Sequence, residues 1–305
     1  MTVTRGTSEL RRVTAWGMVP TPFTRDGAVD RPSLCRVVQH LRRCGCDGVI
    51  ALGAIAEPFT LSPRERSDVV RTIATAADGA PVVGAVLGLD SDRFAVDFDA
   101  LEPSARVVLD AVMIPVTTPD PNSLRSAIAR AGDVSGLPVF LQDLPRFSGV
   151  HVGHADLIEA VSASPSCIAV KCEAPPTYER IGLLAAHTEA ALISGFGGLG
   201  VVDDVIAGAS SVAIGSTVTR AVVDATRLAL AGRYDDASTV IGTVAARIHF
   251  ETQPGANVAI RKRHWERAGV IDTHVVRAPT LPFRSEFEKH SAVHAPGVPQ
   301  QGLSL

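Results

Sequence analysis

The sequence predicts an α/β fold, a TIM (β/α)8 barrel with a C-terminal helical extension. Eight short apolar runs bounded by turn residues have the length and composition of buried strands. Segments with helical spacing lie between most of them, and such alternation is typical of a parallel sheet covered by helices on both faces. Eight is the number of strands at which such a sheet closes into a barrel. A doubly wound open sheet is the main alternative.

The expected strands and the clearest helices follow in order along the chain. The eight apolar runs are TAWGMV from Thr14, GVIALG from Gly48, PVVGAVL from Pro81, AVMIPV from Ala111, PVFLQD from Pro138, IAVKCE from Ile168, AALISG from Ala190 and SVAIGS from Ser211. Residues 32–44 carry apolar side chains at helical spacing. Another helix is expected after Ser62, because Ser62 can cap its amino end, Pro63 fits its first turn and Glu65 completes a capping box.

The strand pattern stops after Ser216, and only helical patterns follow it. We therefore assign residues 1–218 to the barrel and residues 219–289 to a helical extension. Residues 290–305 are polar, rich in proline and glycine and without periodicity. This composition predicts a mobile tail.

Charge and composition favour a small molecule as the partner. The 305 residues have a formal net charge of −3 and no run of like charges, whereas binding to nucleic acid or to an anionic membrane would need an excess of positive charge. The amino-terminal residues lack the apolar core of a signal peptide, and no stretch of eighteen or more residues is continuously apolar. These features predict a cytoplasmic protein.

Cysteine and histidine spacing does not indicate a metal site. The five cysteines are odd in number and lie mostly in apolar surroundings, which favours reduced thiols over disulfides. Cys44 and Cys46 lie close together, but no second pair of cysteines or histidines has metal-binding spacing. We expect neither a metal nor another cofactor.

A lysine interrupts the sixth expected strand. Strand periodicity places Ala169, Lys171 and Glu173 on the face toward the barrel interior, and Ile168 on the face toward the helices. Lys171 is one of only three lysines in the chain, and it comes late in its strand, where barrel active sites lie. It could pair with Glu173 as a structural ion pair, or it could be an amine kept partly neutral so that it forms an imine.

Four stretches resemble the dihydrodipicolinate synthase and N-acetylneuraminate lyase family in their order and spacing. They are GMVPTPFTRDGAVD from Gly17, GVIALGAIAEPFTLSPRER from Gly48, FLQDLP from Phe140 and IAVKCE from Ile168. The similarity runs from about residue 17 to about residue 279. It implies an eight-stranded barrel with a helical extension, assembled as a homotetramer. It also implies that Lys171 forms a Schiff base with pyruvate or another 2-oxo acid.

The loop after the second strand departs from the family pattern. The family has Gly-Thr-Thr-Gly-Glu, which holds the carboxylate of the 2-oxo acid, whereas residues 53–57 read Gly-Ala-Ile-Ala-Glu. Both threonine hydroxyls are absent. Backbone N–H groups at such a turn can still bind a carboxylate. The resemblance therefore implies that Gly53, Ala54 and Ile55 bind substrate.

The fifth strand lacks the family's proton-shuttling tyrosine. Residues 142–145 read Gln-Asp-Leu-Pro where the family has Tyr-Asn-x-Pro. Because glutamine does not exchange protons at ordinary pH, Gln142 is expected to orient a carbonyl, a hydroxyl or a water. Glu173 becomes the candidate proton carrier, with a pKa that burial could raise toward neutrality, and a counter-ion for Lys171 is the alternative. This combination resembles a branch that includes 2-keto-3-deoxyarabonate dehydratase.

The resemblance implies three further substrate-binding residues. Thr117 aligns near a second family tyrosine, Arg146 lies one residue from a family arginine that meets substrate carboxylate, and Gly195 lies near the imine. Gly195 also opens GFGGLG, which matches the dinucleotide fingerprint G-x-G-x-x-G. Six expected strands precede the strand that GFGGLG follows, and no acidic residue follows at the required distance, so we expect no nicotinamide site.

Together these features predict a Schiff-base lyase of the aldolase or 2-keto-3-deoxy sugar-acid dehydratase type, with Lys171, Glu173 and Gln142 in the chemistry. The missing tyrosine and threonines leave a different class open, a non-catalytic binding or regulatory descendant of the family. An aldolase recruited to a specialised biosynthetic pathway is also open.

Overall fold

A computed structural model describes residues 5–90 and 93–295, and a closed barrel of eight parallel strands lies at its centre. Neighbouring strands pair in chain order, and β8 pairs with β1 to close the sheet. The strands are β1 Ala15–Met18, β2 Gly48–Ala51, β3 Val82–Ala85, β4 Ala111–Pro115, β5 Val139–Asp143, β6 Cys167–Cys172, β7 Ala191–Ser194 and β8 Ser211–Ile214. Each lies within, or one residue from, its expected apolar run. The TIM barrel is confirmed, and the open sheet is excluded.

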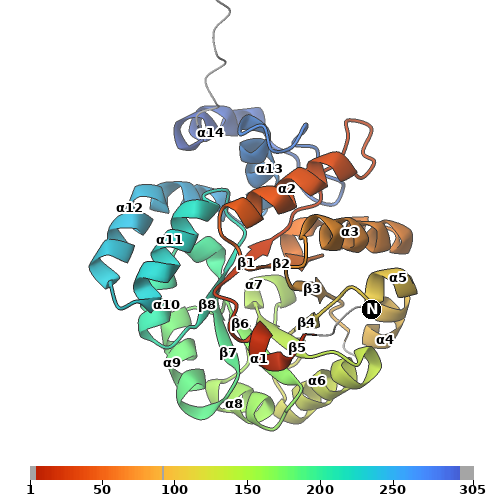
Figure 1. The fold of residues 1–305 in the computed structure, drawn as a ribbon, viewed down its shortest axis with the longest axis vertical. Helices are drawn as coiled ribbons and strands as arrows, with labels where there is room; N and C mark the ends of the chain where they lie inside the picture. Colours follow the sequence, from red (N-terminus) through yellow and green to blue (C-terminus); the bar gives the residue numbers. More distant parts are fainter. Residues whose placement is uncertain (1–4, 91–92, 296–305) are drawn as a thin grey trace, which may run out of the picture.

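Helices form a ring around the sheet (Figure 1). The α-helices are α1 Thr7–Leu10, α2 Arg31–Arg43, α3 Pro63–Ala76, α4 Phe94–Asp99, α5 Pro103–Arg106, α6 Pro121–Ser135, α7 Pro145–Ser148, α8 His154–Ser162, α9 Thr177–His187, α10 Val201–Ile206, α11 Thr219–Leu230, α12 Tyr234–Glu251, α13 Asn257–Arg267 and α14 Glu288–His294. Short 3-10 turns are η1 Ala54–Ala56, η2 Pro58–Thr60, η4 Phe196–Gly198 and η5 Ser285–Phe287.

The helix start predicted at Ser62 is confirmed in its details. The Ser62 side chain accepts a hydrogen bond from the Glu65 backbone N–H, and the Glu65 carboxylate accepts one from the Ser62 N–H at 2.9 Å. Each residue thus satisfies an amide that the first turn of a helix leaves without a partner. The capping box fixes where α3 begins, and with it the length of the loop that follows β2.

The barrel has two apolar cores, one inside the sheet and one between the sheet and the helices. Trp16 and Phe140 pack against each other in the inner core, the one inside the sheet, with ring centroids 5.3 Å apart. Ile168 belongs to this inner core as well, so its predicted outward orientation is wrong. A register shift between β5 and β6 leaves Ile168 without a pairing partner, and an extra residue of this kind breaks the strict alternation of faces.

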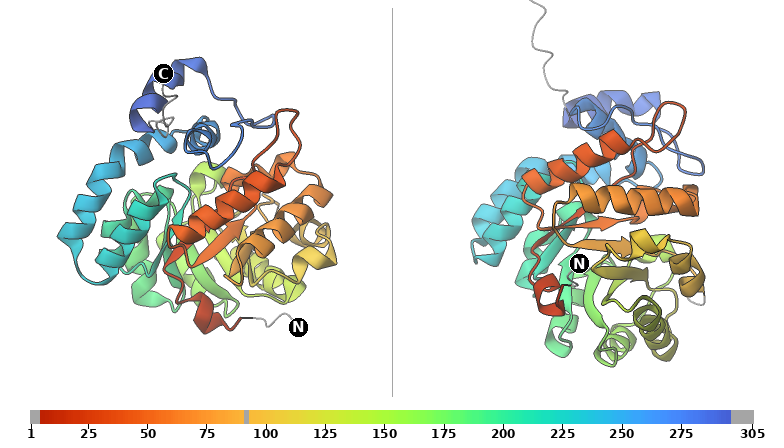
Figure 2. Two further views of the ribbon diagram at one scale, coloured as in Figure 1. Left: turned by 45° about the horizontal axis from the view of Figure 1, so that its top comes forward. Right: turned by 45° about the vertical axis from the view of Figure 1, so that its right-hand side comes forward.

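The two ends of the barrel are covered differently. Leu10 of α1 joins the inner core at the amino-terminal end, whereas α13 and α14 lie at the opposite end (Figure 2). Residues 290–294, which the sequence assigns to a mobile tail, form most of α14 instead. Ala295 ends the described part of the chain, and the rest of the expected tail, residues 296–305, lies outside the described residues. Within the described ranges, no helix combines the length and the apolarity that a membrane crossing requires.

Replacement of Phe140 by alanine should lower the free energy of unfolding by about 3–5 kcal/mol, because it opens a cavity inside the closed sheet. Urea unfolding measures this change. The matched variant is Tyr178→Ala, because Tyr178 is 55% exposed and its loss should cost roughly 1 kcal/mol or less. Equal losses in the two variants would contradict the assignment of Phe140 to the inner core.

Candidate active site

Lys171 lies at the carboxyl end of β6 and points into a cavity of about 90 Å³ at the mouth of the barrel. Its neighbours in the sheet are Gln142 on β5 and Ile193 on β7. The side chain is almost fully buried, and its Nζ donates a hydrogen bond to Glu173 Oε2 at 2.5 Å. The strand therefore turns the amine inward, as its periodicity predicts, and supplies it with a carboxylate.

Glu173 is the centre of a hydrogen-bond network. Gln142 Nε2 donates to Glu173 Oε2 at 2.8 Å, and the backbone N–H of Phe196 donates to Glu173 Oε1 at 3.4 Å. Gln142 Oε1 is buried without a hydrogen-bond partner in the described part of the chain. That oxygen is an acceptor beside Lys171, which suits the orienting role predicted for Gln142.

The expectation that burial raises the pKa of Glu173 is wrong. Burial does act in that direction, but the Lys171 ammonium and the hydrogen bonds from Lys171, Gln142 and Phe196 outweigh it, and the pKa of Glu173 lies below its ordinary value. In the resting protein Glu173 is therefore a carboxylate and the counter-ion of Lys171. It can accept a proton but holds none to donate.

The loop after β7 fits tightly against Glu173. A Cβ atom added at Gly195 would lie 2.2 Å from Glu173 Cγ, so only glycine fits there. The next residue, Phe196, adopts a left-handed backbone conformation with φ of 48°. This conformation is costly for a residue with a side chain, and such strain is typical of functional sites. Here it presents the Phe196 N–H to Glu173. Gly195 itself contacts Glu173 and does not line the cavity, so its predicted substrate contact stays a prediction.

The loop after β2 reaches the cavity through two of its three predicted residues. Ala54 and Ile55 line the cavity, whereas Gly53 precedes η1 and lies against Met18, which is itself a lining residue. Methyl groups stand where the family has hydroxyls. The loop then turns at Glu57, which is buried and left-handed with φ of 55°.

Of the predicted substrate-binding residues Arg146 and Thr117, only Arg146 lines the cavity beside Lys171. Arg146 lines the cavity, where its guanidinium lies over the Phe196 ring and donates to the Thr252 carbonyl at 3.2 Å. Thr117 lines a separate small pocket with Ile114 and Pro115 rather than the cavity beside Lys171. The structure therefore does not place Thr117 beside Lys171, and its predicted contact with substrate stays a prediction.

Sequence reasoning missed the part of the site that comes from the helical extension. Thr252, Asn257 and Arg261 also line the cavity, and they belong to the end of α12 and to α13. Lys262 forms a buried ion pair with Glu57, so that α13 is tied to the loop after β2. The scarcity of lysine was a signal for Lys262, but no pattern in the sequence joined residue 262 to residue 57.

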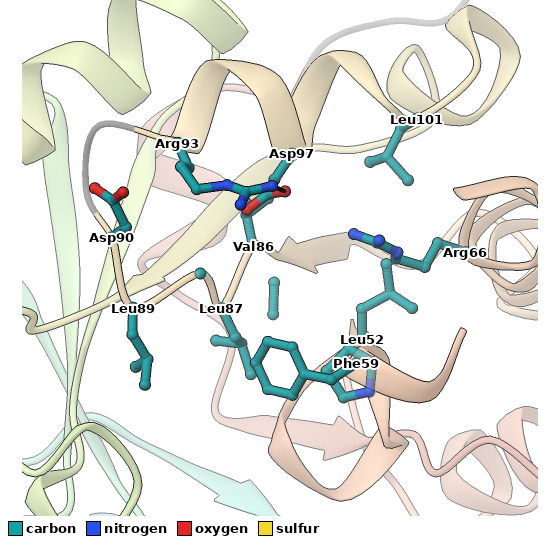
Figure 3. Close-up of a pocket in the computed structure, with 13 residues that line it drawn as sticks. Leu52, Phe59, Arg66, Val86, Leu87, Leu89, Asp90, Arg93, Asp97 and Leu101 are labelled. Carbon is teal, nitrogen blue, oxygen red and sulfur yellow. Dashed lines mark ion pairs between the residues drawn. The ribbon is translucent and has the colours of Figure 1, made fainter. Parts of the chain in front are cut away.

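A larger pocket of about 410 Å³ lies beside the mouth, on the other side of the loop after β2 (Figure 3). Arg66 points toward it from α3, and Arg93 forms an ion pair with Asp97 at its rim. Neither Lys171 nor Glu173 borders this pocket. Of the two cavities, only the smaller one is therefore lined by Lys171 and Glu173.

Metal-binding chemistry has no support within the described ranges. No group of three or more histidine, cysteine or acidic side chains is arranged to hold a metal ion there. The five cysteines are free thiols. Burial raises the pKa of Cys46 and that of Cys167 to about 12, so neither is a reactive thiolate at neutral pH.

Fold and site together define a (β/α)8 barrel with a buried lysine on its sixth strand, facing a cavity beside a carboxylate. The chain belongs to the dihydrodipicolinate synthetase family, which matches residues 12–295. This membership agrees with the resemblance seen in the sequence motifs.

Relatives and solved structures support the same assignment. The 4-hydroxy-tetrahydrodipicolinate synthase of Kineococcus radiotolerans is 27% identical over 288 residues, or 90% of this chain and 89% of that protein. The 4-hydroxy-tetrahydrodipicolinate synthase 1 of Streptomyces coelicolor is 30% identical over 152 residues, so the match spans about half of each chain. The crystal structure of dihydrodipicolinate synthase from Rhodopseudomonas palustris has a TM-score of 0.84 at 24% identity, covering 93% of this chain and 97% of that one, which shows the shared fold.

Replacement of Glu173 by glutamine should lower the free energy of unfolding by about 3–5 kcal/mol at pH 7, because Lys171 would be left buried without a counter-ion. A lowered pKa stabilises the fold above the ordinary carboxyl value and ceases to do so as the pH falls. The difference between the two proteins should therefore shrink below about pH 4.3. Urea unfolding at several pH values measures it, with exposed Glu179→Gln as the control. A difference that stays constant with pH would contradict the ion pair.

A methyl group at Gly195 should displace Glu173 and cost about 1–3 kcal/mol of unfolding free energy, the usual cost of overpacking. Gly195→Ala is compared with Gly242→Ala on the exposed face of α12, where nothing lies within 4 Å of the new atom. The second change should stabilise the helix by about 0.5–1 kcal/mol. If Gly195→Ala is neutral, the contact with Glu173 is not as described.

Proposed function

We propose that the chain is a Schiff-base-forming lyase in which Lys171 attacks the carbonyl carbon of pyruvate or another 2-oxo acid. The observation that carries this proposal is the buried amine of Lys171, which borders a cavity and is hydrogen-bonded to a carboxylate at 2.5 Å. Membership of the dihydrodipicolinate synthetase family and the synthase names of the relatives support a reaction of this class.

Proton transfer within the Lys171–Glu173 pair is the first step of the proposed mechanism. Only a neutral amine is a nucleophile, and Glu173 Oε2 can take the proton across the hydrogen bond. The amine then adds to the 2-oxo carbon to give a carbinolamine. Glu173 returns its proton to the carbinolamine hydroxyl, which leaves as water, so the product is a protonated imine and Glu173 is again a carboxylate. This cation draws electrons from the neighbouring C3–H bond.

Glu173 also has the position for the second proton transfer. As a carboxylate it accepts a proton from C3, and the imine becomes an enamine. In a dehydratase, the enamine expels the C4 hydroxyl, and the proton held by Glu173 leaves with it as water. In an aldolase, the same enamine adds to an aldehyde or forms by loss of one. Gln142 would orient the hydroxyl or the aldehyde oxygen through its amide.

The glutamine at position 142 favours a 2-keto-3-deoxy sugar-acid dehydratase over an aldolase. An orienting amide at residue 142, where the family has a proton-shuttling tyrosine, leaves Glu173 as the carrier between C3 and the leaving hydroxyl. Water loss from a 2-keto-3-deoxy acid, measured as the oxo product, supports the dehydratase. Cleavage of a carbon–carbon bond with release of an aldehyde would instead support the aldolase.

A homo-oligomer, specifically a tetramer, in the cytoplasm is part of the same proposal. Phe59 and Leu89 support an assembly, because both are large apolar residues that lie more than half exposed beside the larger pocket. Light scattering of the purified chain measures the assembly state, and a monomer at micromolar concentration would contradict it.

Incubation with pyruvate and borohydride should leave a reduced adduct on the peptide that contains Lys171, because borohydride fixes an imine as a stable amine. Lys171→Ala should give no adduct. Exposed Lys289→Ala should give the full amount, and it is a matched control in a chain with three lysines. Peptide mass spectrometry measures the outcome. Absence of any adduct in the unaltered protein, with several 2-oxo acids, would favour a non-catalytic binding protein.

A further inference from the structure

Arg261 of α13 occupies an unusual position for an arginine. It is 6% exposed and lines the cavity that contains Lys171 and Glu173. Its Cζ lies 3.9 Å from the point that a Cβ atom would occupy on Gly215, and Ile55 Cδ1 lies 3.4 Å from the same point. Arg261 therefore stands next to the loop after β2, at the place where that loop has lost its hydroxyls.

No carboxylate partner is available to Arg261 among the described residues. Its Nε is buried without a hydrogen-bond partner. Two acids, Glu251 and Glu173, act on its charge through space. Both are already engaged, Glu173 by Lys171, Gln142 and the N–H of Phe196.

Glu251 is occupied even more completely. Its Oε1 accepts hydrogen bonds from His264 Nδ1 at 2.6 Å and Arg247 Nε at 3.0 Å, and its Oε2 accepts one from the Thr217 N–H at 2.7 Å. These contacts hold the end of α12 against α13, and within the described part of the chain Glu251 forms its ion pairs with Arg247 and His264 rather than with Arg261. Glu251 therefore offsets part of the positive charge of Arg261 through space without forming a hydrogen bond with its guanidinium.

A buried cation without a partner is energetically costly. Burial lowers the pKa of Arg261, yet a guanidinium stays protonated in proteins, so it cannot escape the cost by losing its proton. A guanidinium also carries a fork of N–H donors that matches a carboxylate. Arg261, which lines the cavity, can therefore bind an anionic group of a ligand that enters the cavity.

We propose that Arg261 binds the carboxylate of the 2-oxo acid, in place of the hydroxyls that Ala54 and Ile55 lack. This inference rests on the proposed function, since it assigns the group next to the carbonyl that Lys171 attacks. A cavity of about 90 Å³ that holds both Lys171 and Arg261 suits a ligand in which carbonyl and carboxylate are bonded directly. The Lys262–Glu57 ion pair, one residue along the helix, fixes Arg261 relative to the loop.

The test compares binding of oxamate, an amide that has the carboxylate and size of pyruvate but resists imine formation. Calorimetry should show at least tenfold weaker binding to Arg261→Met than to the unaltered protein. Arg261→Lys, which keeps the charge but not the fork, should fall between them. Arg263→Met is the matched control on the same helix, because Arg263 pairs with Glu266 and Glu288 and should leave binding unchanged.

A second measurement separates carboxylate recognition from damage to the site. Borohydride trapping on Lys171 should need at least tenfold more pyruvate in Arg261→Met, whereas trapping of acetone, which has no carboxylate, should be unchanged. The inference is overturned if Arg261→Met reduces trapping of both ketones equally. It is also overturned if the unaltered protein does not bind oxamate, or if it binds oxamate no more tightly than Arg261→Met does. Oxamate binding that depends on Arg261 without any adduct in the unaltered protein would uphold the inference and overturn the proposed imine chemistry.

Discussion

The ion pair between Lys171 and Glu173 is the interaction on which the rest of the site depends. An amine inside a closed sheet would be costly if it were alone, and a carboxylate two residues further along the chain, just past the end of β6, offsets that cost. The surrounding features serve the carboxylate. The bare backbone of Gly195 makes room for it, and the strained Phe196 and the Gln142 amide each donate to it.

Strand and helix positions were predictable because they depend on local patterns. The apolar runs located all eight strands, and the residues around Ser62 located a helix start to the residue. Ile168 was misplaced because a shift between β5 and β6 depends on the partner strand, which periodicity within one strand does not reveal. The pKa of Glu173 was misjudged in direction because the balance between burial and a cation depends on a distance of 2.5 Å.

The site divides in the same way into a predictable and an unpredictable part. Residues at strand ends, such as Lys171 and Gln142, could be placed from the register of the barrel. Thr117 could not, because the direction of a loop beyond its strand is not periodic. Arg261 was missed for a further reason. Its helix carries charged residues in succession, and only packing distinguishes the buried Arg261 from the partly exposed Arg263 and Arg267.

In this barrel the residues around Lys171 come from two different parts of the fold, the strand ends and the appended helix α13. Lys171 and the carboxylate beside it come from the end of β6, whereas Arg261, the cation that lines the same cavity, comes from a helix added after the eighth strand. Ligand preference can therefore diverge through substitutions in an appended helix while the reactive residues stay in place. A shortened chain that keeps only the closed sheet would retain the lysine but would lose the part of the cavity wall that the ends of α12 and α13 supply.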